Sequence, residues 1–329
     1  MFKIEEALTF SDVLLKPRFS TVKSRNEVST AVDLGGLVYK HPVIPANMAS
    51  VVNLGMAREI IESGGLAILH RFMTINDQVA IVAELHSPAY LGVSLGVQDK
   101  DKYFAMRLYD VGARIFCIDI AHGDSSQCVE MIAHLKCNFP DAIIIAGNVA
   151  TAGGAERLWS AGAHIVKAGI GAGATCSTRI ETGNGVPQLH ALMDIASVRK
   201  GRTLISDGGI SSAGDIVKAL CLSDMVMCGQ LFAGCAEAPG TRVIRDGQYF
   251  KEYNGSSTHK DGYIEGVKSW VPIIGPFKQV LGKILDGVRS GCSYQGVSSV
   301  EELSKNFEFL RVSSAGLRES HPHNVILNT

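Results

Sequence analysis

The sequence lacks several features that mark whole classes of protein. It has no basic excess: 31 Lys and Arg stand against 32 Asp and Glu in 329 residues, giving a net charge of −1. It has no run of about 18 uninterrupted apolar residues. Its first residues, MFKIEEALTF, carry acids where a signal peptide has a basic patch and an apolar core. We therefore expect a cytoplasmic protein with neither nucleic acid nor membrane as a partner.

Cysteine pairs with the spacing of metal ligands are also missing. The chain has 8 cysteines, but no CxxC pair, which argues against a zinc ribbon. Most of them lie in apolar segments such as IFCIDI and MVMCGQ, where cysteine behaves as a small buried hydrophobic residue. Cys176 is the exception, because glycines and hydroxyl residues surround it.

Short apolar runs alternate with amphipathic segments along most of the chain. The runs span 41–48, 66–70, 90–97, 115–121, 142–149, 164–170, 202–209 and 224–230. Helical patterns between them include 53–63, 125–136, 153–162 and 187–198. Repeated strand–helix alternation predicts a (β/α)₈ TIM barrel, which we expect to occupy 1–329 as a single catalytic domain. A doubly wound sheet is the rival fold, but no GxGxxG motif opens a helix after the first strand.

The segment after the eighth run differs in character. Residues 241–253, TRVIRDGQYFKEY, predict a β-hairpin with its turn at Asp-Gly. A stretch rich in glycine and serine follows, and we expect a flap over about 250–270.

Polar or glycine residues end seven of the eight predicted strands: Asn47, His70, Asp119, Asn148, Lys167, Asp207 and Gly229. In a barrel these ends meet at one mouth, where the active site lies. Any one of them could simply terminate a strand. Seven at corresponding positions favour a shared site.

The run KAGIGAGATCSTR places Cys176 in a glycine-rich loop after the sixth strand. A thiolate at the barrel mouth could act as a nucleophile, but a free surface thiol fits the residues equally well. The glycines in SDGGI and MCGQLFAG follow the last two strands, where barrels commonly bind phosphate. Asp207, at the end of the seventh predicted strand, could bind the hydroxyl groups of a ribose or cap the turn that follows this strand; the two roles are compatible.

Several longer stretches carry a more specific signal. PANMASV, CIDIAHGDS, AGNVATAGGAERLWSAGAHIVKAGIGAGATCSTR, SDGGISSAGDIVKAL and EAPG resemble the family of inosine-monophosphate dehydrogenases and guanosine-monophosphate reductases, in the same order, over about residues 8–297. The resemblance implies a (β/α)₈ barrel that acts on purine nucleotides with a nicotinamide cofactor. It also implies that Cys176 attacks purine C2 to form a covalent thioimidate.

The resemblance favours the reductase branch. No regulatory domain is inserted between LAILHRFMT and YLGVSL, although some dehydrogenases also lack it. TGNGVPQL and YIEGVKSWVP are similar to reductase segments, and no Arg-Tyr dipeptide occurs in 254–275. The implied reaction is NADPH-dependent reductive deamination of GMP to IMP and ammonia, a step of purine interconversion and salvage, with Thr178 and Glu265 relaying a proton. By itself, Glu265 would be a solvated acid in a polar loop.

The resemblance also implies the remaining site residues. It assigns the cofactor to Ser24, Arg25, Arg71, Asp119, Ile120, Ala121 and Ser290, with Ser24 and Arg25 approaching its adenosine end from a neighbouring subunit. It assigns the nucleotide to Asn47, Asp207, Gly208, Gly209, Gly229, Gln230, Gly255, Ser256 and Gly266. A potassium site would use carbonyls of Gly171, Gly173, Cys176 and Arg179, and a homotetramer is expected.

Departures from the family pattern keep other activities open. Ala49 stands where Asp is common, Ala172 and Ala174 replace the usual Pro and Ser, and Arg71 replaces a Lys. Ala174 lacks a hydroxyl that often holds the phosphate. The alternatives are an IMP dehydrogenase without the regulatory domain, a reductase for a divergent purine nucleotide, and a nucleotide-binding relative with a sensing role.

Overall fold

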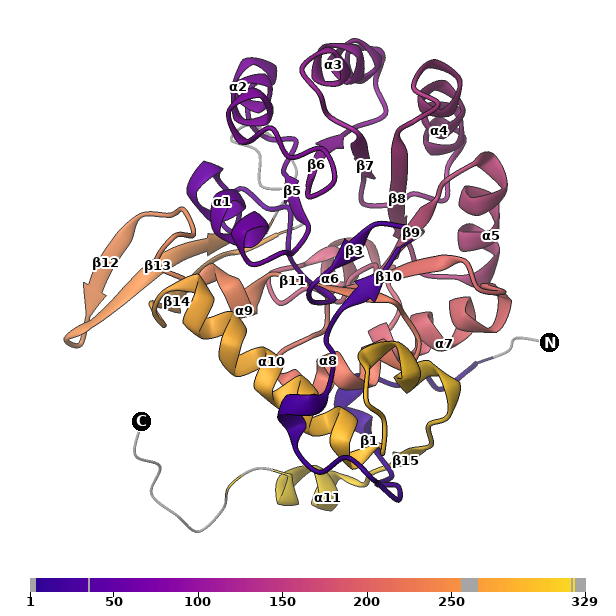
Figure 1. Ribbon diagram of the computed structural model, residues 1–329, viewed down its shortest axis with the longest axis vertical. Coiled ribbons are helices and arrows are strands. Elements are labelled where there is room, and N and C mark those ends of the chain that lie inside the picture. The colour runs from indigo at the N-terminus through magenta and orange to yellow at the C-terminus, as the bar shows by residue number, and fades with distance from the viewer. Residues whose placement is uncertain (1–3, 35, 256–265, 321, 323–329) are drawn as a thin grey trace.

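The computed structural model describes residues 4–34, 36–255, 266–320 and 322. Eight parallel strands form one curved sheet with helices around it (Figure 1). The strands are β4 (Val43–Pro45), β5 (Ala67–Leu69), β6 (Leu91–Leu95), β7 (Ile115–Asp119), β8 (Ile143–Val149), β9 (Ile165–Ala168), β10 (Thr203–Asp207) and β11 (Met225–Cys228). All eight lie within the predicted apolar runs, so that prediction is confirmed.

The strand order makes this sheet a barrel. Hydrogen-bonded neighbours run β4-β11-β10-β9-β8-β7-β6-β5, so the chain winds around in sequence order and β11 returns to β4. β4 and β5, at the two ends of this order, also contact each other. The (β/α)₈ prediction is therefore correct, and the doubly wound alternative is wrong. The ends of these parallel strands converge, as the prediction of a common site requires.

A helix follows each strand of the barrel. These helices are α1 (Leu54–Glu62), α2 (Ile75–Leu85), α3 (Asp99–Asp110), α4 (Ser126–Asn138), α5 (Ala152–Ala161), α7 (Gln188–Val198), α8 (Ala213–Leu220) and α10 (Phe277–Tyr294). Two short helices, α6 (Thr178–Thr182) and α9 (Gln230–Ala233), lie in the loops after β9 and β11. Several helices begin at a side-chain cap that satisfies a free N–H group, as Asn53 does for α1 and Thr151 for α5.

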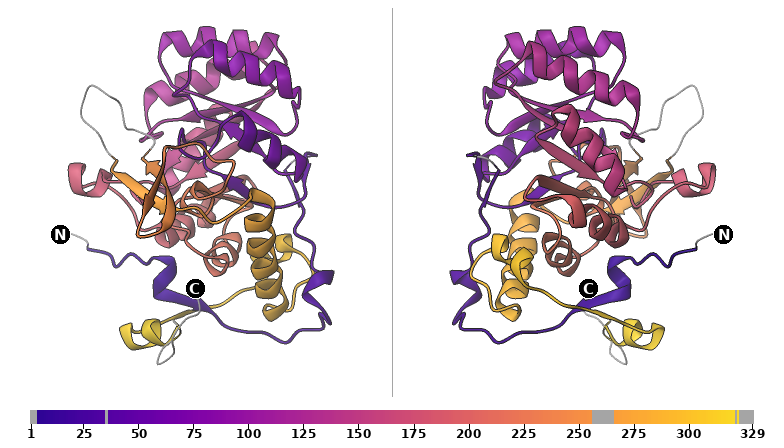
Figure 2. Two further views of the ribbon diagram at one scale, coloured as in Figure 1. Left: turned by 90° about the vertical axis from the view of Figure 1, so that its left-hand side faces the viewer. Right: turned by 90° about the vertical axis from the view of Figure 1, so that its right-hand side faces the viewer.

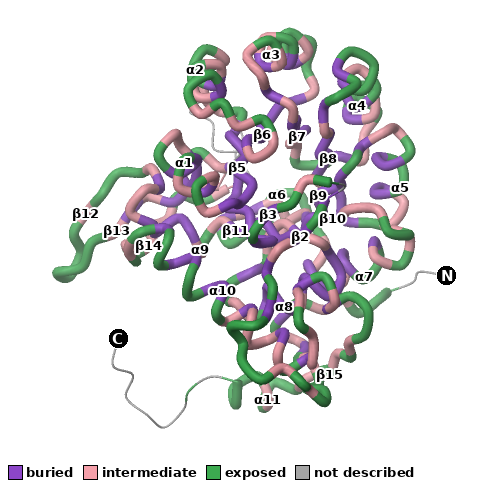
Figure 3. The backbone as a smooth tube through the Cα atoms, viewed as in Figure 1, coloured by how far each residue is buried: buried purple, intermediate pink, exposed green. Residues whose placement is uncertain are grey.

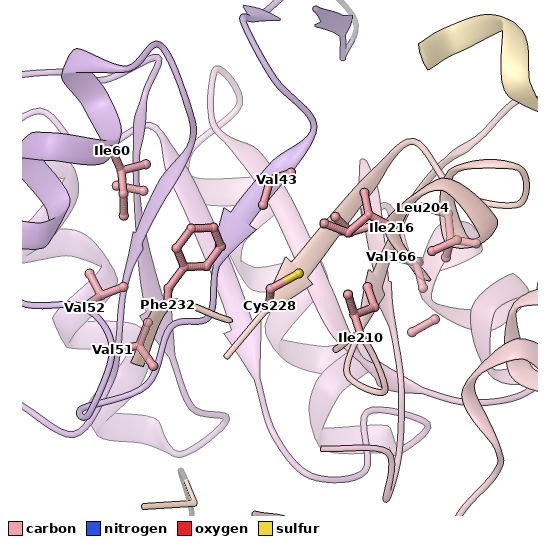
Figure 4. Close-up of a cluster of buried hydrophobic side chains, with 14 of the residues drawn as sticks. Val43, Val51, Val52, Ile60, Val166, Leu204, Ile210, Ile216, Cys228 and Phe232 are labelled. Atoms are coloured by element: carbon pink, nitrogen blue, oxygen red, sulfur yellow. The ribbon is translucent and has the colours of Figure 1, made fainter. Parts of the chain in front are cut away.

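The hydrophobic core has two parts because each barrel strand is buried on both faces. Inside the barrel, Ile44, Ile68, Ile145 and Ile205 pack with one another. Between the strands and helices, residues such as Val43 and Phe232 are fully buried (Figure 4). Figure 3 shows the same division, with buried strands at the centre and exposed outer helix surfaces.

Further elements extend the barrel. A three-stranded antiparallel sheet comprises β12 (Arg242–Arg245), β13 (Gln248–Asn254) and β14 (Lys268–Pro272). Its first two strands form the predicted hairpin, with positive φ at both Asp246 (49°) and Gly247 (77°), as a tight hairpin turn requires. The predicted flap begins in β13 and ends in β14, and its central residues 256–265 lie outside the described residues.

The N- and C-terminal segments meet at the end of the molecule opposite α2–α4 (Figure 2). There β1 (Val13–Leu15) pairs with β15 (Phe309–Arg311). The other small elements are β2 (Val32–Asp33), β3 (Val38–Tyr39), α11 (Ser314–Glu319) and three 3₁₀ helices, η1 (Phe10–Asp12), η2 (Arg25–Glu27) and η3 (Val300–Lys305). That 1–329 act as one catalytic domain stays a prediction.

Candidate active site

The loop after β9 presents Cys176 beside a hydroxyl group. The Cys176 thiol donates to Thr178 Oγ1 at 3.0 Å, and Thr178 is the first residue of α6. The Cys176 N–H donates to Gly173 O at 3.1 Å, which tightens the turn before the thiol. Cys176 also forms an isolated antiparallel bridge with Gly266. The thiol is partly exposed, unlike the buried Cys117, Cys128, Cys221, Cys228, Cys235 and Cys292.

A pocket of about 210 Å³ opens next to this thiol. It lies at the carboxyl ends of the barrel strands, as the sequence predicted. Most predicted site residues line it: Asn47, Arg71, Asp119, Ile120, Ala121, Gly171, Gly173, Cys176, Thr178, Asp207, Gly208, Gly209, Gly229, Gln230 and Gly255. The fold therefore brings together residues that are up to about 200 positions apart in the sequence.

Other predicted site residues lie elsewhere. Ser24 caps η2, which begins at Arg25 and packs against α10, the helix that contains Ser290. None of these three lines the pocket. That Ser24 and Arg25 approach the cofactor of a neighbouring subunit, and that Ser290 contacts a cofactor, stay predictions. Arg179 and Gly266 flank the cysteine loop without lining the pocket, and Ser256 and Glu265 lie outside the described residues.

The floor of the pocket carries a buried charge network. Lys167 Nζ lies 3.0 Å from Asp119 Oδ1 and 2.5 Å from Asp207 Oδ2. Asn148 Nδ2 donates to the same Asp207 oxygen at 2.9 Å and to Gly169 O at 2.7 Å. Burial alone would lower the pKa of Lys167, but the carboxylates of Asp119 and Asp207 outweigh it and hold that pKa above its ordinary value. The ammonium therefore stays charged.

The turns after β10 and β11 pack closely against the cysteine loop and the hairpin sheet. Gly208 and Gly209 have φ of 97° and 73°, a conformation that favours glycine. A Cβ on Gly208 would lie 3.3 Å from the carbonyl carbon of Ala172. A Cβ on Gly229 would lie 2.6 Å from the Tyr253 hydroxyl, which comes from β13. These glycines leave room for backbone groups to approach an anionic ligand.

Arg71 and the end of β7 form another side of the pocket. Arg71 Nε donates to Asp119 O at 3.0 Å, and its guanidinium lies 4.6 Å from the centroid of the Phe72 ring. This exposed cation next to the half-buried Ile120 fits the polar and planar parts of a nicotinamide cofactor. The residues present thus fit the implied group.

The implied potassium ligands are backbone carbonyls, a donor type that suits this ion. The carbonyl of Gly173 already accepts a hydrogen bond from the Cys176 N–H group. The carbonyl of Arg179 accepts one from the Gly183 N–H group at 3.2 Å. Each carbonyl retains a second lone pair, so the donor chemistry fits. Within the described ranges, no group of three or more His, Cys, Asp or Glu could hold a metal ion.

Sequence reasoning missed several residues of this pocket. The sequence pattern marks Lys167 and Asn148 only as strand ends, and the pocket is also lined by Met48, Phe72 and Tyr253, which that pattern does not mark. A lysine inside the apolar run HIVKAGI was an available signal, because a buried charge needs a partner. Burial raises the pKa of Tyr253 to about 12, so its hydroxyl keeps its proton at neutral pH.

Comparison with known proteins decides the family. Residues 7–323 match the model described as IMP dehydrogenase / GMP reductase domain. The chain belongs to the IMP dehydrogenase/GMP reductase family. A GMP reductase from Shouchella clausii is 37% identical over 322 residues, which cover 95% of this chain and 97% of that protein. The oxidoreductase assignment follows from this membership.

Two further relatives frame the comparison. An inosine-5′-monophosphate dehydrogenase from Halalkalibacterium halodurans is 41% identical over 254 residues, covering 71% of this chain and 52% of that protein. A solved GMP reductase variant from Trypanosoma brucei, in complex with guanosine 5′-monophosphate, superposes with a TM-score of 0.89 at 26% identity, covering 98% of this chain and 99% of that one. The chain thus matches a whole reductase and about half of a dehydrogenase.

The architecture between β5 and β6 agrees with this difference in coverage. Only α2 and short connections join Leu69 to Leu91, so no additional domain is inserted there. Among the helices described, none combines the length and apolarity needed to cross a membrane.

Proposed function

We propose that this member of the IMP dehydrogenase/GMP reductase family catalyses NADPH-dependent reductive deamination of GMP to IMP and ammonia. The observation that carries the proposal is the Cys176–Thr178 pair, with 3.0 Å between Sγ and Oγ1, at the edge of a pocket that Asp207 and the Gly208-Gly209 turn also line. This arrangement offers a nucleophile, a hydroxyl for proton transfer and a nucleotide subsite in one cavity.

Cys176 is the proposed nucleophile. Its sulfur adds to C2 of the purine while the thiol proton passes to Thr178 Oγ1, and the bond from C2 to the 2-amino nitrogen then breaks. A nicotinamide cofactor, held beside Arg71 and Ile120, would supply the hydride that C2 accepts. The C2–S bond breaks afterwards, which returns the thiolate and releases IMP. The glycines around Cys176 keep the approach to its sulfur open, because they add no side chains.

Thr178 is the proposed proton donor to the departing amino group. An amine leaves readily only when it is protonated, and the Thr178 hydroxyl lies beside the sulfur that forms the bond to C2. Glu265 would return the proton to this hydroxyl. The bridge between Cys176 and Gly266 supports this role, because Gly266 directly follows Glu265 in the chain.

The nucleotide subsite is proposed at the ends of β10 and β11. The Asp207 carboxylate would accept hydrogen bonds from the ribose hydroxyls. Backbone N–H groups of the Gly208-Gly209 turn and of Gly229 would bind the phosphate. We further propose that the cation-binding carbonyls hold potassium, and that the protein is a cytoplasmic homotetramer.

The test is a spectrophotometric comparison of two reactions on the purified protein. NADPH oxidation that depends on GMP, with IMP and ammonia as products, is the expected result. XMP formation from IMP with NAD, without GMP-dependent NADPH oxidation, would instead identify a dehydrogenase. Activity confined to another purine nucleotide would support the divergent-substrate alternative that Ala172 and Ala174 keep open. Binding without turnover of any of these would support a sensing role.

A further inference from the structure

Lys167 has an unusual position among the charged residues of the pocket. It lies in β9, its side chain is only 2% exposed, and its ammonium contacts two carboxylates at once. Asp207 belongs to the neighbouring strand β10, whereas Asp119 ends β7, which is separated from β9 by β8. The ammonium therefore joins two sides of the barrel mouth.

Each carboxylate faces a different part of the proposed site. Asp207 adjoins the glycine turn assigned to the nucleotide, and Asn148 gives it one further hydrogen bond. Asp119 adjoins Ile120 and Ala121, assigned to the cofactor, and Arg71 holds its backbone carbonyl. The carboxylates are 17% and 20% exposed, so water screens their mutual repulsion only in part.

The charge balance of this network depends on one group. One ammonium and two carboxylates give a net charge of −1, and removing the ammonium leaves two facing anions. Cys117 also faces Lys167, but burial raises the pKa of its thiol, so it contributes no charge. Asn148 is neutral.

We propose that Lys167 is a positioning residue that holds Asp207 for the nucleotide and Asp119 for the cofactor with one ammonium group, and so couples the two subsites. This inference rests on the proposed function, because that function assigns the two sides of the pocket. Lys167 contacts the two carboxylates and acts through them.

The experiment uses three variants: Lys167→Met, Asp119→Asn and the double variant. Affinity for GMP and for NADPH is measured separately by calorimetry, beside Tm. Lys167→Met should weaken both affinities by about tenfold or more, which corresponds to about 1.4 kcal/mol. Asp119→Asn should weaken the affinity for NADPH and leave the affinity for GMP unchanged. The double variant removes the repulsion between the two carboxylates and keeps the hydrogen bond from Asn148 to Asp207, so its GMP affinity should return to within about threefold of the unmodified protein.

A matched control separates positioning from stability. Lys218→Met also removes a largely buried lysine, which lies 3.5 Å from Asp215 and donates to Phe10 O at 2.8 Å in the outer layer. It should lower Tm and leave both affinities within about twofold. The double variant also covers the case in which Lys167→Met does not fold, because it removes the repulsion between the two carboxylates.

A second readout follows the charge directly. In Lys167→Met the two facing carboxylates repel each other without a cation between them, and binding of a proton by either one relieves this repulsion. The Tm deficit of this variant should therefore narrow between pH 8 and about pH 5. The deficit of the double variant should narrow less, because only one carboxylate is left without its cation.

The outcomes distinguish the two proposals. If the unmodified protein reduces GMP but the double variant binds GMP as weakly as Lys167→Met, the coupling is refuted and the function stands. Unchanged affinities in Lys167→Met also refute the coupling. If the unmodified protein neither binds nor reduces GMP, the proposed function fails, and the coupling fails with it.

Discussion

Replacing Gly169 by alanine should damage both the stability and the activity of the protein. Gly169 follows β9 directly and has φ of 151°, which L-residues rarely adopt. A Cβ at this position would lie 1.8 Å from Asp207 O and 2.9 Å from Gln188 Oε1. The first of these is a backbone atom of a strand end, so no rotation of a side chain relieves the clash.

The expected magnitude has two parts. Overpacking of this kind costs about 1–3 kcal/mol, and a side chain at a glycine-only φ costs about as much again. A total of about 2–6 kcal/mol, with an unfolding entropy of about 2.1 cal/mol/K per residue, lowers Tm by about 3–9 °C. The Asp207 carbonyl must move by about 1 Å, and a displacement of that size near reacting groups reduces kcat/KM by about 10²-fold.

Gly201→Ala is the matched control. Gly201 has φ of 79°, but no atom lies within 4 Å of the position of its Cβ, and it does not line the pocket. This variant measures the backbone strain alone, about 1–2 kcal/mol, and should keep full activity. Thermal unfolding and GMP-dependent NADPH oxidation are measured for both variants. If Gly169→Ala matches the control in Tm and keeps full kcat/KM, the steric reasoning is refuted.

Cys176→Ala should abolish turnover and keep GMP affinity within about tenfold. The control Cys137→Ala, which removes an exposed thiol, should change neither turnover nor affinity. Near-normal turnover in Cys176→Ala would show that this thiol takes no part in the reaction. Thr178→Val should slow ammonia release by about 10²–10⁴-fold, as loss of a proton-transfer group does. Thr178→Ser keeps the hydroxyl and should stay active. Ammonia release by Thr178→Val at the rate of the unmodified protein would contradict this role. Burial lowers the pKa of His41 and His70 to about 4, so stability is complete above about pH 6.5 and falls as the unfolded chain takes up protons, by about 2 kcal/mol per histidine at pH 5. Urea unfolding at pH 7 and pH 5 measures this loss of unfolding free energy. His41→Gln should reduce the loss, and a loss equal to that of the unmodified protein would contradict the prediction.

The sequence alone was sufficient for the barrel and for the β12–β13 hairpin. Strands buried on both faces need continuous apolar runs, and this requirement is local, so it is visible without the fold. The Asp246-Gly247 turn is local for the same reason, since both residues tolerate positive φ. The cysteine loop is also visible in the local sequence, because the glycine and hydroxyl residues around Cys176 distinguish this cysteine from the others.

Only the tertiary structure decided which distant groups meet at the pocket. Tyr253 reaches Gly229 because β13 packs beside the loop after β11, and nothing near either residue in the sequence indicates this contact. The pairing of β1 with β15 is likewise a contact between segments from the two ends of the described chain, and only the fold brings them together. Lys167 was visible as a charge in an apolar run, but its two partners depend on barrel closure. Closure brings β7 and β10 within reach of one ammonium, and because a buried ion is stable only among such partners, the fold decides its role.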